Sequence, residues 1–174
     1  MVITAITAFS SVVRAQTFEE ARQYAFNGER EKARQICKIL LAEGFNSDVA
    51  LLMGRTYAWD GKYDSARIVF NTVLIQKPEN IEVLGAFADV EYWSEAYDKA
   101  VQYCNMALEK EPDSEYFVLK KARILNSNEK YESSVETLEV FFQKHPGSAE
   151  VRKKIKEYRL DLMKNQLKLA YTID

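Results

Sequence analysis

The chain has 174 residues, with 24 Lys and Arg against 26 Asp and Glu, so its net charge is -2 at neutral pH. Charges of both signs are mixed along the chain without a basic run, which argues against nucleic acid as a partner. Only three prolines and six glycines are present. Most of them fall at the boundaries of helical stretches, so the composition favours one elongated helical domain of uninterrupted helices.

The N-terminal segment is apolar. Residues 2–13 are apolar or small, and this run is too short to span a bilayer. Val13, Arg14 and Ala15 before Gln16 fit a cleavage site with small residues. No Lys or Arg precedes the run, so a buried strand or the start of a helix is the alternative. We favour export and interpret residues 1–16 as a truncated signal peptide.

Residues 17–146 repeat with a period of about 34 residues. Pro78, Pro112 and Pro146 stand 34 residues apart, and each follows an amphipathic helical stretch. A column of small residues has the same spacing, and it consists of Ala33, Ala66, Ala100 and Ser134. The four units are residues 17–45, 48–78, 79–112 and 113–146. Such a period predicts helical pairs that stack, because one pair cannot bury its apolar face alone.

The second unit has the clearest pattern, G-x2-Y-x3-G-x-Y-x2-A-x3-F-x7-P from Gly54 to Pro78. Small residues at Gly54 and Ala66 would let two antiparallel helices approach, and Phe70 would fill the space around them. This spacing resembles that of tetratricopeptide repeats. The resemblance implies an all-α, right-handed superhelix in which the first helix of each unit lines a concave groove.

The C-terminal residues depart from the repeat. Residues 147–164 carry apolar side chains at helical spacing among many charges, with Ser148 as N-cap, which predicts a capping helix. Residues 165–174 (NQLKLAYTID) alternate apolar and other side chains, which predicts a strand. An isolated strand needs a partner, so this strand would begin a second structure.

Three segments carry a more specific resemblance. They are residues 52–67 (LMGRTYAWDGKYDSAR), residues 88–93 (ADVEYW) and the change from a charged helix to the alternating residues 165–174. Together they resemble the periplasmic part of YaiO-like outer-membrane proteins, in which repeats precede a β-barrel. The resemblance implies a periplasmic location, attachment to the outer membrane through a barrel that begins at the terminal strand, and a link to exopolysaccharide export, which a related architecture serves.

Two columns of the first helices are candidates for ligand binding. The aromatic column is Phe26, Trp59 and Trp93, with Ser127 in the fourth unit and Tyr92 beside it; the polar column is Arg22, Arg55, Asp89 and Arg123. An aromatic ladder would suit sugar rings or the apolar side chains of a peptide. The alternative, which we favour, is that the two tryptophans pack in the core and that the arginines form a solvated face or local ion pairs.

Catalytic, cofactor and metal sites are not predicted. His145 precedes Pro146 in an expected loop, where a general base would lack a pocket. Cys37 and Cys104 share the core column of Phe70, two units apart, which argues against both a disulfide and a metal site. We therefore expect a protein that is not an enzyme.

The sequence predicts a binding module for a protein, a peptide or an envelope polysaccharide. The resemblance places it in the periplasm, attached to the outer membrane. The first alternative is a cytoplasmic adaptor that joins proteins, and the second is an accessory part of an exopolysaccharide synthesis or export system. Neither the ligand nor the oligomeric state follows from the sequence.

Overall fold

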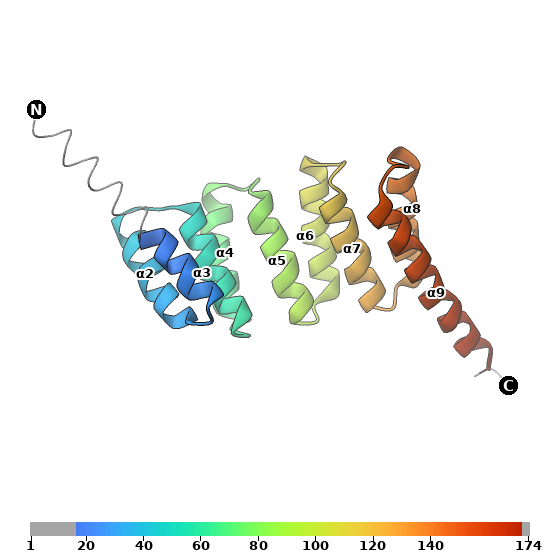
Figure 1. Ribbon diagram of the computed structural model, residues 1–174, viewed down its shortest axis with the longest axis horizontal. Helices are drawn as coiled ribbons and strands as arrows, with labels where there is room; N and C mark the ends of the chain where they lie inside the picture. Colours follow the sequence, from blue (N-terminus) through green and yellow to red (C-terminus); the bar gives the residue numbers. More distant parts are fainter. Residues whose placement is uncertain (1–16, 172–174) are drawn as a thin grey trace, which may run out of the picture. The chain divides into compact units, whose positions relative to one another are not determined.

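The computed structural model describes residues 17–171; the predicted signal peptide, residues 1–16, and residues 172–174 lie outside the described part. Residues 17–26 form the first helix. The helices that follow are α2 (Arg30–Glu43), α3 (Ser47–Trp59), α4 (Tyr63–Gln76), α5 (Ile81–Trp93), α6 (Tyr97–Lys110), α7 (Glu115–Ser127), α8 (Tyr131–Lys144) and α9 (Ala149–Tyr171) (Figure 1). No strand occurs between residues 17 and 171, so the predicted all-α fold is confirmed there.

The chain divides into two compact units, residues 1–86 and 87–174, and the boundary falls within α5. In the first unit, α3 packs against both α2 and α4. Its core gathers small and aliphatic side chains from residues 17–26, α2 and α3: Ala21, Ala25, Ala33, Cys37, Leu40, Val49 and Leu52. In the second unit, α7 packs against α6, α8 and α9, and α8 also packs against α9.

Unit 2 contains two groups of buried side chains. The larger group lies among α7, α8 and α9 and contains Val118, Ala122, Val135, Leu138, Phe141, Val151, Ile155 and Tyr158. The smaller group joins α5, α6 and α7 through Ala88, Ala100, Cys104 and Ile124. The predicted column of small residues is fully buried in every pair, since Ala33, Ala66, Ala100 and Ser134 are each 0% exposed. Ser134 satisfies its hydroxyl by donating to the carbonyl oxygen of Ala122, 2.8 Å away.

Gly54 permits the closest contact between α3 and α4. A Cβ atom at this position would lie 2.1 Å from Cε1 of Phe70, whose ring is 0% exposed. No side chain larger than hydrogen fits there unless the ring moves. The predicted roles of the small residue at 54 and the large residue at 70 are therefore both visible in the packing.

Two kinds of turn separate the helices. Within each pair, one residue takes a positive φ: Gly28 (87°), Gly61 (70°), Glu95 (60°) and Glu129 (56°). Between pairs, the prolines stand two residues beyond the last residues of α4, α6 and α8, where a proline cannot disturb a helical hydrogen bond. The first kind of turn is accessible to glycine without strain, whereas the glutamates adopt it at a cost.

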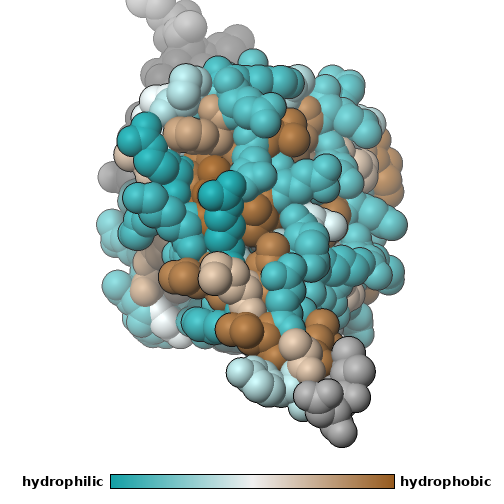
Figure 2. All heavy atoms as spheres, turned by 90° about the vertical axis from the view of Figure 1, so that its right-hand side faces the viewer, coloured by the Kyte–Doolittle hydropathy of each residue, from teal (hydrophilic) through white to brown (hydrophobic). Residues whose placement is uncertain are grey.

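The strand predicted from Asn165 is wrong for residues 165–171, because α9 continues without a break to Tyr171. Ser148 begins this helix as predicted, with its Oγ accepting a hydrogen bond from the amide of Val151. The alternating residues were misleading because the same side chains also fit a helical stripe: Leu160, Met163, Leu167 and Tyr171 follow spacings of three and four, and all are more than half exposed. In Figure 2, hydrophobic side chains gather toward this end of α9 amid a largely hydrophilic surface. Across residues 17–171, no helix is both long and apolar enough to cross a membrane.

A buried arginine joins α2 to the end of α3. The Arg34 side chain is 3% exposed; it donates to the carbonyl oxygen of Thr56 at 3.0 Å and to Asp60 at 2.7 Å, and it also pairs with Glu31. Its guanidinium carbon lies 4.9 Å from the ring centre of Tyr57. Burial by itself would raise the pKa of Asp60, but hydrogen bonds from Arg30 and Arg34 outweigh it, so the pKa of Asp60 lies below its ordinary value. This network closes the turn of the pair opposite the Gly54 contact.

We expect Gly54→Ala to lower the free energy of unfolding by about 1–3 kcal/mol, because the new methyl group clashes with the buried ring of Phe70. Helix propensity favours alanine by about 1 kcal/mol, so a net loss can come only from the clash. Urea denaturation followed by circular dichroism measures the change. Gly54→Ala/Phe70→Leu should recover most of the loss. As a control, Gly147→Ala adds a methyl group in open space and should change little; an equal loss at both glycines would contradict the packing argument.

We expect Arg34→Met to cost about 2–3 kcal/mol, because it removes the main partner of a partly buried carboxylate. A depressed pKa in the fold means that Asp60 stabilises above its unfolded-state pKa of about 4 and loses this contribution as the pH falls through the folded value. Denaturation curves of Arg34→Met should therefore depend less on pH between about pH 5 and pH 2 than those of the wild type. Arg22→Met is the control, since Arg22 and Glu19 form a half-exposed pair; identical pH profiles for Arg34→Met and the wild type would refute the role of the network.

Candidate functional site

A hollow of about 410 Å³ opens in unit 2 on the side formed by the first helices of the pairs. We name it the first-helix hollow. Its walls come from α5, α7 and α9, and its lining residues are Asp89, Tyr116, Leu119, Lys120, Arg123, Glu150, Lys154 and Tyr158. Three consecutive pairs thus contribute to one cavity, because equivalent positions of stacked helices fall side by side.

A charge cluster forms one wall of the first-helix hollow. The Lys120 side chain is 6% exposed, and its Nζ lies 2.6 Å from Oδ1 of Asp89 on α5. Arg123, one turn further along α7, approaches the same oxygen only to 3.6 Å, and its side chain is half exposed. Since Asp89 already serves the buried ammonium, the guanidinium of Arg123 keeps donor capacity for another anion.

Tyrosine rings flank these cations. Tyr116 is 58% exposed, and its ring centre lies 4.9 Å from Nζ of Lys120. The guanidinium of Arg123 lies 4.9 Å from the ring centre of Tyr92, whose hydroxyl is 3.1 Å from Oγ of Ser127. Tyr92 thereby holds Arg123 against a fixed surface, while Tyr116 presents an open ring to the hollow.

The α9 wall adds a third cation. Nζ of Lys154 lies 5.5 Å from the ring centre of buried Tyr158 and 2.8 Å from a carboxylate oxygen of Glu157. The hydrogen bond to Glu157 raises the pKa of Lys154, so its positive charge is retained at neutral pH. Burial raises the pKa of Tyr158, so its hydroxyl stays neutral. The hollow therefore contains three cations, Lys120, Arg123 and Lys154, against the two anions Asp89 and Glu150.

This arrangement suits an anionic group attached to an apolar or planar one. The anion would meet Arg123 and Lys154, and the apolar part would lie against Leu119 and the exposed ring of Tyr116. Titratable groups here serve charge and hydrogen bonding.

The structure brings together only part of the predicted groove residues. Asp89 and Arg123 of the polar column both line the first-helix hollow, and Tyr92 supports Arg123 from beside it. Trp93 is 42% exposed and is not among the lining residues. Ser127, which ends the aromatic column, contributes the hydrogen bond to Tyr92. The polar column is thus represented in the hollow and the aromatic column is not.

The predicted residues of unit 1 make local contacts. The rings of Phe26 and Trp59 lie 5.6 Å apart, and Trp59 also packs against the core and lies 6.0 Å from the guanidinium of Arg30. Arg22 pairs with Glu19, as expected for a solvated face, and Arg55 is exposed. The contacts of Trp59 agree with the packing interpretation of the aromatic column.

Six lining residues were missed by the sequence analysis: Tyr116, Leu119, Lys120, Glu150, Lys154 and Tyr158. A signal for two of them exists, because Lys120 and Lys154 stand 34 residues apart, three residues before the positions of Arg123 and Glu157. A lysine column on an amphipathic helix usually indicates a solvated face, so it carried no weight without the burial of Lys120.

The residues considered for catalysis occupy ordinary structural positions. Nε2 of His145 lies 2.9 Å from Oδ1 of Asp113, and its ring packs on Phe141. Cys37 and Cys104 are fully buried in the cores of their respective units. Burial raises the pKa of Cys37 to about 11 and that of Cys104 to about 12, so neither thiol forms a reactive thiolate at neutral pH.

Comparison with solved structures gives three similar folds at low sequence identity. MamA from Desulfovibrio magneticus RS-1 aligns with a TM-score of 0.69 and 17% identity, over 91% of this chain and 90% of that one. MamA AMB-1 aligns with a TM-score of 0.63 and 17% identity, over 93% and 89% of the two chains. A tetratricopeptide repeat protein from Parabacteroides merdae ATCC 43184 aligns with a TM-score of 0.69 and 15% identity, over 85% of this chain and 60% of that one. These identities establish a shared fold.

Comparison with curated protein sequences gave no match. The sequence model described as Tetratricopeptide repeat matches residues 57–124, from the last turn of α3 to α7. The 34-residue period, the helical pairs with small residues at their crossings and the structural neighbours lead to the same result. The chain has the fold of a tetratricopeptide repeat superhelix, with the repeat sequence itself matched over residues 57–124.

Proposed function

We propose that this chain is a non-catalytic binding module that holds a segment of a partner protein in the first-helix hollow. The tetratricopeptide repeat fold suggests a protein-interaction module. The observation that carries the proposal is the excess of cations around an exposed tyrosine in a cavity of about 410 Å³. A peptide offers both an anionic group, on a side chain or at its C-terminus, and an apolar side chain a few ångströms away.

The packing of the hollow supports specific recognition over general charge attraction. Lys120 is almost fully buried, so its charge acts in a region of low polarity where it is poorly screened. Tyr92 and Asp89 both restrict Arg123, which lowers the entropy lost when a ligand binds. An envelope polysaccharide has less support, because the predicted aromatic ladder is not assembled in this hollow.

We also propose, on separate grounds, that the protein is exported to the periplasm and belongs with YaiO-like outer-membrane proteins. The support is the apolar run of residues 2–13, the small residues before Gln16 and the resemblance of residues 52–67 and 88–93. A cytoplasmic adaptor would use the same hollow on an intracellular partner. Recognition and location are therefore independent proposals.

The recognition proposal is tested by placing a photoreactive phenylalanine analogue at position 116 in cells that encode the protein. Tyr116 is the exposed aromatic of the hollow, so we expect a covalent adduct with a defined protein. Adding Arg123→Glu should reduce the yield several-fold, because it reverses the charge that meets the ligand anion. Mass spectrometry of the adduct identifies the partner and the residues joined.

Two controls make that experiment specific. The same analogue at Ile75, which is 80% exposed on α4, should not give the adduct. Lys153→Glu makes the same kind of charge change on an exposed residue of α9 outside the hollow and should leave the yield unchanged. Equal adducts at positions 116 and 75, or no effect of Arg123→Glu, would exclude the hollow as the binding site.

The location is tested by fractionating cells and sequencing the N-terminus of the mature protein. Export predicts recovery from the cell envelope with Gln16 as the first residue. A cytoplasmic product that retains residues 1–15 would refute export and favour the adaptor alternative, without bearing on the hollow.

A further inference from the structure

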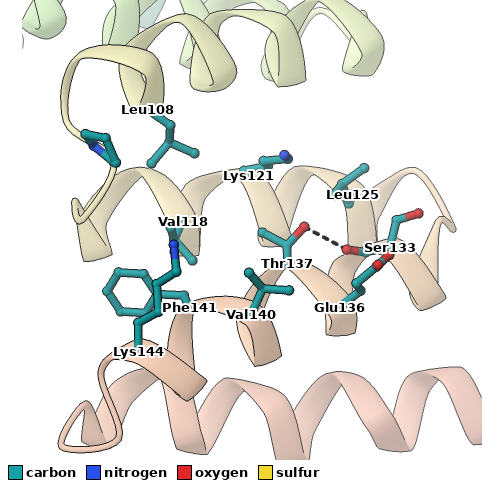
Figure 3. A pocket seen from close by; sticks show the side chains of 11 residues that line it. Leu108, Val118, Lys121, Leu125, Ser133, Glu136, Thr137, Val140, Phe141 and Lys144 are labelled. Carbon is teal, nitrogen blue, oxygen red and sulfur yellow. Dashed lines mark hydrogen bonds between the residues drawn. The ribbon is translucent and has the colours of Figure 1, made fainter.

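A second hollow lies on another face of α7, against α8, with a volume of about 490 Å³ (Figure 3). We name it the α7/α8 hollow. Its walls are mainly apolar, from Leu108, Val118, Leu125, Val140 and Phe141. On α8 it extends from Ser133 to Lys144, which is roughly 16 Å of helix. No lining residue is shared with the first-helix hollow, so the two surfaces are separate.

The α7/α8 hollow exists because an aromatic pair found one repeat earlier is missing. In the preceding pair, the rings of Phe87 and Tyr103 stack with centres 4.5 Å apart and planes at 11°, joining α5 to α6. The residues 34 positions later are Lys121 and Thr137, and both line the hollow. A flexible lysine and a small threonine cannot fill the volume of two stacked rings, so the apolar walls remain open.

The charges of this hollow are also unsatisfied. Lys121 and Lys144 make no ion pair or side-chain hydrogen bond within residues 17–171, and the same holds for Glu136. Figure 3 shows the Lys144 side chain rising beside Val118, at the opposite end of the hollow from Glu136. Thr137 is satisfied, since its hydroxyl donates to the carbonyl oxygen of Ser133 at 2.7 Å. Two free ammonium groups against one carboxylate favour an acidic occupant.

We propose that the α7/α8 hollow is a second protein-docking site, which takes an acidic segment of a partner and receives an aromatic side chain where Phe87 and Tyr103 would lie in the preceding pair. The aromatic ring packs between Val118, Val140 and Phe141, and the acidic residues of the segment pair with Lys121 and Lys144. The missing internal stack is thus supplied from outside. This inference goes beyond the proposed function, because it concerns a different surface and different residues.

The variant Lys121→Phe/Thr137→Tyr provides the central test, because it restores the residues of the preceding pair and should fill the hollow while keeping the fold. A library of random 12-residue peptides is displayed and selected on the full wild-type chain, with counter-selection on this variant. We expect enriched peptides that combine acidic residues with Phe, Tyr or Trp. Each should bind the filled variant at least about tenfold more weakly than the wild type.

Charge and fold are then separated. Lys121→Glu/Lys144→Glu should weaken the selected peptides about tenfold or more, whereas Lys153→Glu, an exposed residue of α9 outside the hollow, should not. Thermal unfolding should show that the filled variant is at least as stable as the wild type. The proposal is overturned if no peptide survives counter-selection, if the survivors lack acidic or aromatic residues, or if the charge reversal leaves their affinity unchanged. None of these results depends on Arg123 or on adducts at position 116, so the proposed function stands or falls separately.

Discussion

Each helical pair depends on a close approach of its two helices at small, buried residues. One column on the first helices reads Ala21, Gly54, Ala88 and Ala122, and all four are buried. The corresponding column on the second helices reads Cys37, Phe70, Cys104 and Leu138, each 0% exposed. The volumes compensate, because the largest side chain, Phe70, faces the only glycine of the first column. Side chains at one crossing can therefore vary as long as their sum fits the fixed helix spacing.

This constraint explains why so much of the fold could be predicted from the sequence. Residues that must be small at a crossing recur with the period of the repeat, and so do the prolines that cannot lie inside a helix. Helix starts and ends followed from the same columns. The strand at residues 165–171 could not be judged in this way, since it lies beyond the repeats and its apolar residues satisfy both a helical and an alternating pattern. The uninterrupted charged helix before it decided the outcome, because no turn residue intervenes.

The extension of α9 has a cause that is visible in the turn positions. Gly28, Gly61, Glu95 and Glu129 adopt positive φ and end the first helix of each pair. The residue 34 positions after Glu129 is Met163, which lies within α9. The end of the stack is marked at the same time, since the positions of Val118, Ala122 and Leu125 on α7 correspond to Arg152, Lys156 and Arg159 on α9. Buried contacts on α7 are thus replaced by exposed charges, which is the pattern of a capping helix.

The candidate site was harder to predict because binding surfaces depend on which side chains the packing leaves unfilled. Asp89 and Arg123 were found from their column, whereas Lys120 gains its importance only from burial beside Asp89. Similarly, Lys121 and Thr137 are unremarkable in the sequence until they are compared with the stacked Phe87 and Tyr103 one repeat earlier. The repeat therefore predicts where side chains must fill space, and departures from it indicate where a partner can fill it.

The adjacent residues Lys120 and Lys121 show how one helix can serve two surfaces. They point into different hollows, since one lines the first-helix hollow and the other the α7/α8 hollow. The whole chain carries a net charge of -2, yet cations outnumber anions in both hollows, three to two and two to one. Such a local reversal of sign steers anionic segments toward these openings while the rest of the surface repels them. Because α7 forms a wall of both hollows, a partner that shifted this helix on one side would alter the space on the other, so occupancy of the two surfaces would be coupled through α7.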